Sequence, residues 1–101
     1  MAYEIVWAES AAGDLIEAVE FIARDSPSYA ATLVARATAA ADSLKDLPHR
    51  GHPVREYRDP NVRELIVGRS YRLIYRVLDL RVTLIAFVHV ARDLGELVPP
   101  E

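Results

Sequence analysis

An α+β domain, with a helical hairpin packed on one face of a small and mainly antiparallel sheet, is the fold that this sequence predicts. Two neighbouring segments in the N-terminal half repeat apolar residues at helical spacing, and a single short break joins them. Three runs rich in β-branched and aromatic residues follow in the C-terminal half. With one strand at the N-terminus, the expected order is β-α-α-β-β-β within a single domain that covers residues 1–101.

The N-terminal half is expected to hold one strand and both helices. Residues 3–7 are β-branched and aromatic, which favours a strand. Apolar side chains recur every three or four positions through residues 8–24 and predict the first helix. Ser26 can cap a second helix whose first position is Pro27, where a missing N–H costs nothing, and we expect this helix over residues 28–46. Because the connection is short, the two helices must run antiparallel.

The C-terminal half is expected to hold a long loop and three strands. Residues 48–61 contain three prolines and a glycine, which predict an extended loop. Strands are predicted over residues 62–67, 71–77 and 82–89. The last of them is apolar on both faces, which is typical of a central strand.

The strand predicted over residues 71–77 alternates cleanly between two faces, and Arg72 and Arg76 share one of them. If the last hairpin turns at residues 78–81, the same face also carries Phe87 and His89. Such a face combines guanidinium groups with aromatic side chains, which suits docking of a protein or of a stacked base. A solvated face with arginines paired to acidic neighbours is the alternative interpretation.

The composition favours a protein that associates with a partner and argues against a general nucleic-acid binder. Hydrophobic residues make up 51% of the chain and the net charge is −3. Residues 1–48 carry eight acidic and three basic groups, whereas residues 49–101 carry seven acidic groups and nine arginines. Arginine without lysine favours bidentate recognition of carboxylate or phosphate. A general preference for arginine codons would also explain the ratio of arginine to lysine.

Several observations predict a cytoplasmic location. The chain has no cysteine, so a core without disulfides must hold it together, which fits a reducing compartment. Its first residues lack the basic and apolar regions of a signal peptide, and no apolar run approaches the ~20 residues that span a bilayer. We therefore expect no contact with a membrane.

Motifs for common enzyme chemistry are missing from the sequence. It contains no glycine-rich phosphate loop, no G-x-S-x-G and no H-E-x-x-H. His49 and His52 form an H-x-x-H without a nearby third ligand, which is a weak metal motif. We expect neither a metal nor a cofactor.

Two runs near the C-terminus carry a recognisable pattern, RELIVGRSYRLIYRV over residues 63–77 and LIAFVHVAR over residues 84–92. In the N-terminal half, Trp7-Ala8 leads into a helix that contains Asp14, and ARDSP over residues 23–27 joins the helices. Over nearly the whole chain this pattern resembles the ParE/RelE toxin superfamily of type II toxin–antitoxin modules. The order β-α-α-β-β-β is also the order of that superfamily.

This resemblance implies a toxin that a co-expressed, ParD-like antitoxin with a ribbon-helix-helix N-terminus neutralises by wrapping its C-terminal segment around it. ParE-like members poison DNA gyrase without catalysis, whereas RelE-like members are ribosome-dependent mRNA endonucleases. The D-S-P junction and the V-H-x-x-R ending resemble ParE more closely. No tyrosine or lysine follows Arg92, as a RelE-like nuclease would require. We therefore expect a gyrase inhibitor without direct sequence-specific DNA binding, and an mRNA endonuclease is the alternative.

The two alternatives assign different roles to the same part of the chain. A gyrase inhibitor needs no catalytic residue and would use a partner face made of Arg63, Arg72, Arg76, Phe87, His89 and Arg92. A nuclease would use Arg72 and Arg92 for the scissile phosphate, with His89 and Glu64 as the acid–base pair, and Glu56 as a further candidate.

Overall fold

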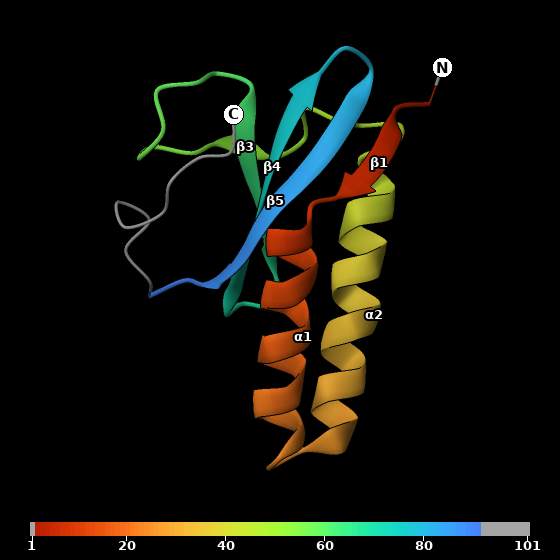
Figure 1. Ribbon diagram of the computed structural model, residues 1–101, viewed down its shortest axis with the longest axis vertical. Coiled ribbons are helices and arrows are strands. Elements are labelled where there is room, and N and C mark those ends of the chain that lie inside the picture. The colour runs from red at the N-terminus through yellow and green to blue at the C-terminus, as the bar shows by residue number, and fades with distance from the viewer. Residues whose placement is uncertain (1, 92–101) are drawn as a thin grey trace.

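The computed structural model describes residues 2–91, which form an α+β fold with two helices on one face of a five-stranded sheet (Figure 1). The elements are β1 (Glu4–Trp7), α1 (Glu9–Ala23), α2 (Pro27–Ser43), β2 (His52–Pro53), β3 (Val62–Val67), β4 (Tyr71–Leu78) and β5 (Arg81–His89). The strand order is β1-β5-β4-β3-β2, and only the pairing of β1 with β5 is parallel. The predicted fold class is confirmed. Among the described helices, none is long and apolar enough to cross a membrane.

The two helices form the antiparallel hairpin that the short connection required (Figure 1). The Tyr29 N–H donates to the Ser26 hydroxyl at 3.2 Å, and Pro27 is the first residue of α2. Small side chains on α2 allow close packing, and its buried residues are Ala30, Leu33, Ala37 and Ala41. The helix ends three residues before the predicted boundary because Leu44 and Lys45 already donate to carbonyls three residues back.

Apolar side chains cover both faces of the sheet. The cluster between helices and sheet includes Leu33, Leu73 and Tyr75. On the opposite face, which we call the outer face, buried residues from three strands pack with the loop residue Val54, and Tyr57 packs against them. These strand residues are Val62, Ile74, Ile85, Ala86 and Val88. The loop that follows β2 therefore covers part of the outer face.

The register between β4 and β5 contains a β-bulge. Ile74 lies opposite Ala86, but the next residue, Tyr75, lies opposite Leu84, so Ile85 is the extra residue on β5. One extra residue reverses the alternation of every side chain beyond it. The prediction that Phe87 and His89 share a face with Arg72 is therefore wrong.

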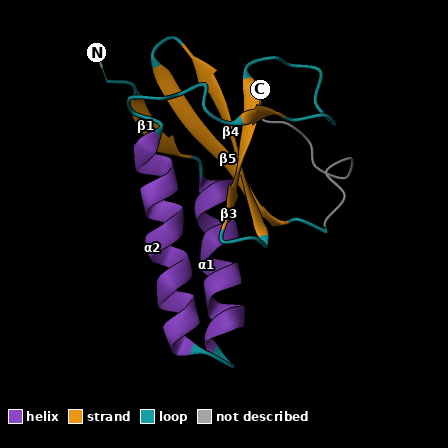
Figure 2. Ribbon diagram, turned by 180° about the vertical axis from the view of Figure 1, so that it is seen from behind, coloured by secondary structure: helices purple, strands orange, loops and turns teal. Residues whose placement is uncertain are grey.

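The loop predicted over residues 48–61 also contains a short strand that the sequence did not reveal. The two residues of β2 lie antiparallel to β3, with His52 opposite Glu64 and Pro53 opposite Arg63 (Figure 2). A two-residue strand that includes proline shows no alternation, so no periodicity could have predicted it. It completes one edge of the sheet.

The turn between β4 and β5 places two non-glycine residues in the left-handed region. Asp79 has φ 52° and Leu80 has φ 61°. Such a two-residue hairpin turn favours glycine at its second position, since a leucine Cβ is strained there. Leu80 is also 52% exposed, so its side chain contributes little to the core.

We expect Leu80→Gly to raise the free energy of unfolding by about 0.5–1 kcal/mol, because the strain removed exceeds the added entropy of the unfolded chain. Urea unfolding monitored by circular dichroism measures the change. Leu78→Gly is the matched control, since Leu78 is equally exposed at 54% but ends strand β4. The control should destabilise the protein, and a loss of stability in Leu80→Gly would contradict the strain.

Candidate functional site

Arg72 is the centre of an ion-pair cluster on the outer face. Its Nε donates to Glu64 Oε2 at 3.0 Å, and Nη2 donates to the same carboxylate. Nη1 and Nη2 also donate to the two oxygens of Glu56, at 3.2 and 3.3 Å. The Arg72 side chain is only 12% exposed. Two carboxylates therefore occupy one guanidinium, and the hydrogen bond from Arg72 holds the pKa of the Glu56 carboxyl below its ordinary value.

The other two strand arginines also contact the long loop. Arg76 Nε lies 3.5 Å from Asp59 Oδ2. Arg63 Nη1 donates to the His49 carbonyl at 3.2 Å and to the Gly51 carbonyl at 2.8 Å. Together with the Arg72–Glu56 pair, these bonds fix the loop against β3 and β4.

Gly51 is a tightly enclosed residue of that loop. Its N–H donates to the Tyr75 hydroxyl at 3.0 Å, and Tyr75 is fully buried. Burial raises the pKa of the Tyr75 hydroxyl, so this group stays neutral at physiological pH. A Cβ on Gly51 would lie 2.5 Å from both the Tyr75 hydroxyl and the Glu64 carbonyl oxygen. Only glycine fits here.

The structure does not bring the predicted site residues together on one face. Arg72, Arg76 and Glu64 share the outer face. Arg63 lies opposite Tyr75, whose side chain belongs to the cluster under the helices. Two further predicted residues also lie on the helix side, where Phe87 belongs to the same cluster and the His89 ring contacts Tyr71 edge-on. Arg92 lies outside the described residues.

Neither histidine of the H-x-x-H takes part in a larger group of metal-ligand side chains. Within residues 2–91 no group of three or more His, Cys, Asp and Glu side chains lies close enough to hold a metal ion.

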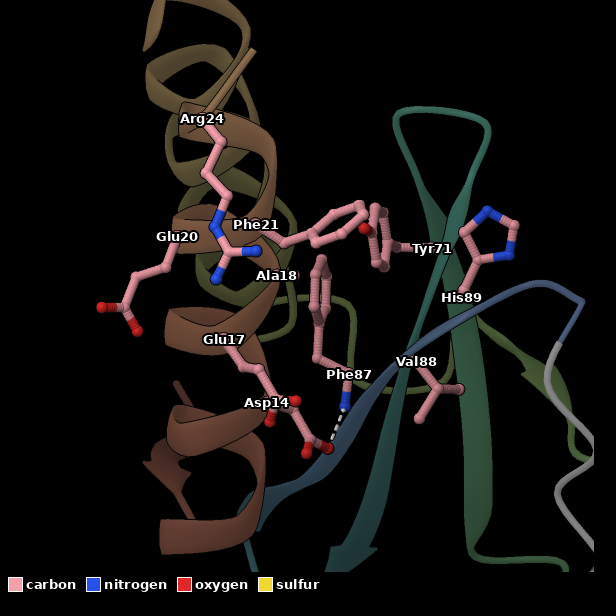
Figure 3. Close-up of a pocket in the computed structure, with 10 residues that line it drawn as sticks. All are labelled: Asp14, Glu17, Ala18, Glu20, Phe21, Arg24, Tyr71, Phe87, Val88 and His89. Carbon is pink, nitrogen blue, oxygen red and sulfur yellow. Dashed lines mark hydrogen bonds between the residues drawn. The ribbon is translucent and has the colours of Figure 1, made fainter. Parts of the chain in front are cut away.

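A groove between α1 and β5 was missed by the sequence analysis. It encloses about 420 Å³. Ten residues line it (Figure 3), namely Asp14, Glu17, Ala18, Glu20, Phe21 and Arg24 of α1 and its C-cap, Tyr71 of β4, and Phe87, Val88 and His89 of β5. One end is closed by a hydrogen bond from the Phe87 N–H to Asp14 Oδ2, at 3.0 Å.

Aromatic rings form one side of this groove. Tyr71 stacks on Phe87 with ring centroids 4.8 Å apart and an interplanar angle of 6°. Phe21 is 64% exposed and lies on the α1 side of the groove. The one available signal was that Phe21 lies off the apolar stripe of its helix, next to Glu17 and Glu20.

Comparison with known proteins defines the class. The family model described as ParE toxin of the type II toxin–antitoxin system parDE matches residues 5–94. Toxin RelE2 of Caulobacter vibrioides is 34% identical over 89 residues, which cover 88% of this chain and 97% of that protein. The fold is also similar to the chromosomal ParDE system of P. aeruginosa, with a TM-score of 0.73, 21% identity, and 88% of this chain and 97% of the other covered. The RelBE2 toxin–antitoxin complex of Mycobacterium tuberculosis gives a TM-score of 0.60 at 26% identity, covering 91% and 95% of the two chains.

The chain is thus a type II toxin of the ParE/RelE superfamily. Since the family model covers most of its length, it belongs to the ParE toxin family. The resemblance stated from the sequence is confirmed at this level.

Gly51→Ala should lower the free energy of unfolding by at least about 2 kcal/mol, because the new methyl group would meet a buried hydroxyl and a backbone carbonyl. Gly13→Ala is the control, since a Cβ at Gly13 would meet nothing within 4 Å. That helical substitution should stabilise the protein by about 0.5–1 kcal/mol. Thermal unfolding of both variants measures the contrast, and equal melting temperatures would rule out the enclosure of Gly51.

Glu56→Gln should lower stability at pH 7 by about 0.5 kcal/mol, since it removes one carboxylate from the exposed side of the Arg72 cluster. The folded pKa of Glu56 is depressed, so its stabilisation is present above the ordinary value of 4.5 and is lost as the pH falls through the folded pKa. The difference from wild type should therefore shrink in urea titrations as the pH falls below 4.5. Glu20→Gln, on the exposed side of α1, is the control and should leave the stability at pH 7 nearly unchanged.

Proposed function

We propose that this protein inhibits DNA gyrase and is held inactive by a ParD-like antitoxin. The matching family model describes the toxin of parDE systems, and the two structural neighbours are named as toxin–antitoxin systems or complexes. Since gyrase acts on the chromosome, this proposal implies that the toxin works in the cytoplasm.

The pairing of Arg72 with Glu56 and Glu64 is the observation that carries this proposal. Cleavage of RNA by its own 2′-OH needs a base, an acid and cations that stabilise the charge on the phosphate. The donors of Arg72 already bind Glu56 and Glu64, so this cluster carries a net negative charge and repels a phosphate. Binding to a protein target needs no free phosphate clamp.

The position of His89 supports the same proposal. The bulge places His89 on the helix side, whereas Arg72 and Glu64 lie on the outer face. His89 Nδ1 also accepts a hydrogen bond from the Ala91 N–H at 3.1 Å. A histidine on the opposite face of the sheet cannot exchange a proton with a nucleotide bound at Arg72.

A ribosome-dependent mRNA endonuclease is the second candidate, because the relative at 34% identity is named RelE2. In that case Arg72 and Arg92 would hold the scissile phosphate, and Glu64 or Glu56 would have to transfer the proton, since His89 lies on the other face of the sheet. Arg72 would first have to release Glu56, the more exposed of its two carboxylates.

The two functions predict opposite results in two assays. Purified toxin should inhibit supercoiling by gyrase and accumulate cleaved DNA, and it should leave mRNA intact during translation in vitro. Arg72→Gln should retain gyrase inhibition to within about threefold, provided that circular dichroism shows a folded protein, because a guanidinium already paired with two carboxylates contributes little to docking. Codon-specific mRNA cleavage that Arg72→Gln abolishes, together with unchanged supercoiling, would establish the nuclease instead.

A further inference from the structure

The edge of β5 that points away from β4 is covered by two different elements in succession. β1 pairs with β5 from Glu4 opposite Arg81 to Trp7 opposite Leu84. Beyond that point side chains of α1 take over, since the Ser10 hydroxyl donates to the Ile85 carbonyl at 2.7 Å.

Four residues along the same helix, Asp14 accepts from the Phe87 N–H at 3.0 Å. Residues four apart share one side of a helix, so Ser10 and Asp14 bind successive groups on one strand edge. α1 therefore substitutes for a paired strand as far as Phe87.

Past Phe87 this edge opens into the groove. Figure 3 shows α1 and β5 diverging beyond the bond between Asp14 and Phe87. The N–H and C=O groups of one strand residue point to the same side, and this side alternates along the strand. The Phe87 carbonyl and the His89 N–H therefore point away from β4, and no other residue within 2–91 bonds to them. An extended segment lying in the groove could pair with both groups.

The side chains around this edge favour positive charge. α1 contains four acidic residues and no basic one, and Asp14, Glu17 and Glu20 line the groove. The guanidinium of Arg24, just after the helix, lies 5.9 Å from the centroid of the Phe21 ring. The lining thus holds three carboxylates and one guanidinium, so its net charge is negative. In Figure 3 the Glu17 side chain points to the same end of the groove as Asp14, whereas the Glu20 side chain points away from the Phe21 ring.

We propose that this groove binds an extended partner segment in which arginine or lysine alternates with apolar residues, added as a further strand to the edge of β5. In an added strand, every second side chain faces α1. The basic side chains reach Glu17 and the Phe21 ring, while the apolar ones turn toward the outer face, where Val88 is buried. The identity of the occupant as the antitoxin rests on the proposed function.

The C-terminal segment of this chain does not fit the chemistry of the groove. Residues 93–101 contain three carboxylates and no basic side chain, so acidic groups of the groove would repel them. A separate chain with basic residues is the complementary occupant.

Fluorescence anisotropy with synthetic peptides tests this proposal directly. The probe is a nine-residue peptide that alternates arginine with valine. Its controls alternate glutamate with valine, or carry the same arginines and valines in two separate blocks. The alternating basic peptide should bind the wild-type protein at least about tenfold more tightly than either control. Equal binding of the block peptide would overturn the proposal, because charge alone would then explain the affinity.

Backbone methylation tests whether the segment binds as a strand. Two versions of the basic peptide carry N-methyl groups, one on every arginine amide and the other on every valine amide. Only one set of amides faces β5 in an added strand, so one version should lose about tenfold in affinity and the other should bind normally. Normal binding of both versions would exclude strand addition, as would helical circular dichroism of the bound peptide.

Variants of the groove test its charge and its aromatic ring. The double variant Glu17→Lys with Glu20→Lys changes two exposed positions. It should lower the affinity for the basic peptide by about tenfold and should raise the affinity for the acidic control peptide. Glu9→Lys with Asp46→Lys has the same net charge, and both residues are exposed outside the groove, so this control should bind like wild type. Phe21→Ala should lower the affinity for the basic peptide by about fivefold. Leu47→Ala should leave this affinity unchanged, since Leu47 is similarly exposed at 61% but lies outside the groove.

These measurements are independent of gyrase. Inhibition of gyrase without any peptide binding would overturn the groove proposal alone. Peptide binding with the expected variant pattern but without gyrase inhibition would overturn the proposed target and leave the groove assignment in place.

Discussion

The extra residue at Ile85 decides which side chains of β5 face the helices and which face outward. Without it, Phe87 and His89 would lie beside Arg72, and Tyr71 would have no aromatic partner from β5 on the helix side. Side chains of α1 hold the distorted strand, since Ser10 and Asp14 bind groups that no neighbouring strand reaches. A bulge thus separates an aromatic, acid-lined groove from the arginine cluster on the opposite face.

Three arginines of the sheet form hydrogen bonds and ion pairs with the loop that follows α2. Each of Arg63, Arg72 and Arg76 contacts a loop residue between 49 and 59. Bonds of this kind add modestly to stability, because desolvation of the charges offsets much of their attraction. Their larger effect is to define one position for a segment that contains only two residues of strand. Gly51 and Tyr75 complete that attachment in the core, where a methyl group has no room.

Local patterns in the sequence predicted most elements but not how β5 turns its side chains. Strand Val62–Val67 and the cap at Ser26 followed from strand-forming residue types and from capping chemistry, which depend only on nearby residues. The bulge left no signal, because Leu84, Ile85 and Ala86 are all apolar and all buried, so either register satisfies the hydrophobic pattern. The face of His89 and the groove depend on that register, so neither could be predicted.

The separation of the two surfaces also constrains how a toxin of this family can be controlled. The groove involves β4 and β5, and the arginine cluster involves β3 and β4 on the opposite face, so a segment bound in the groove does not need to displace Glu56 or Glu64 from Arg72. Any coupling between them must pass through the two paired strands or through direct steric overlap with a large target. The strands are well packed on both faces, and their buried clusters leave little freedom for a graded shift. Steric exclusion by the bulk of a bound partner is therefore the simpler physical route to neutralisation.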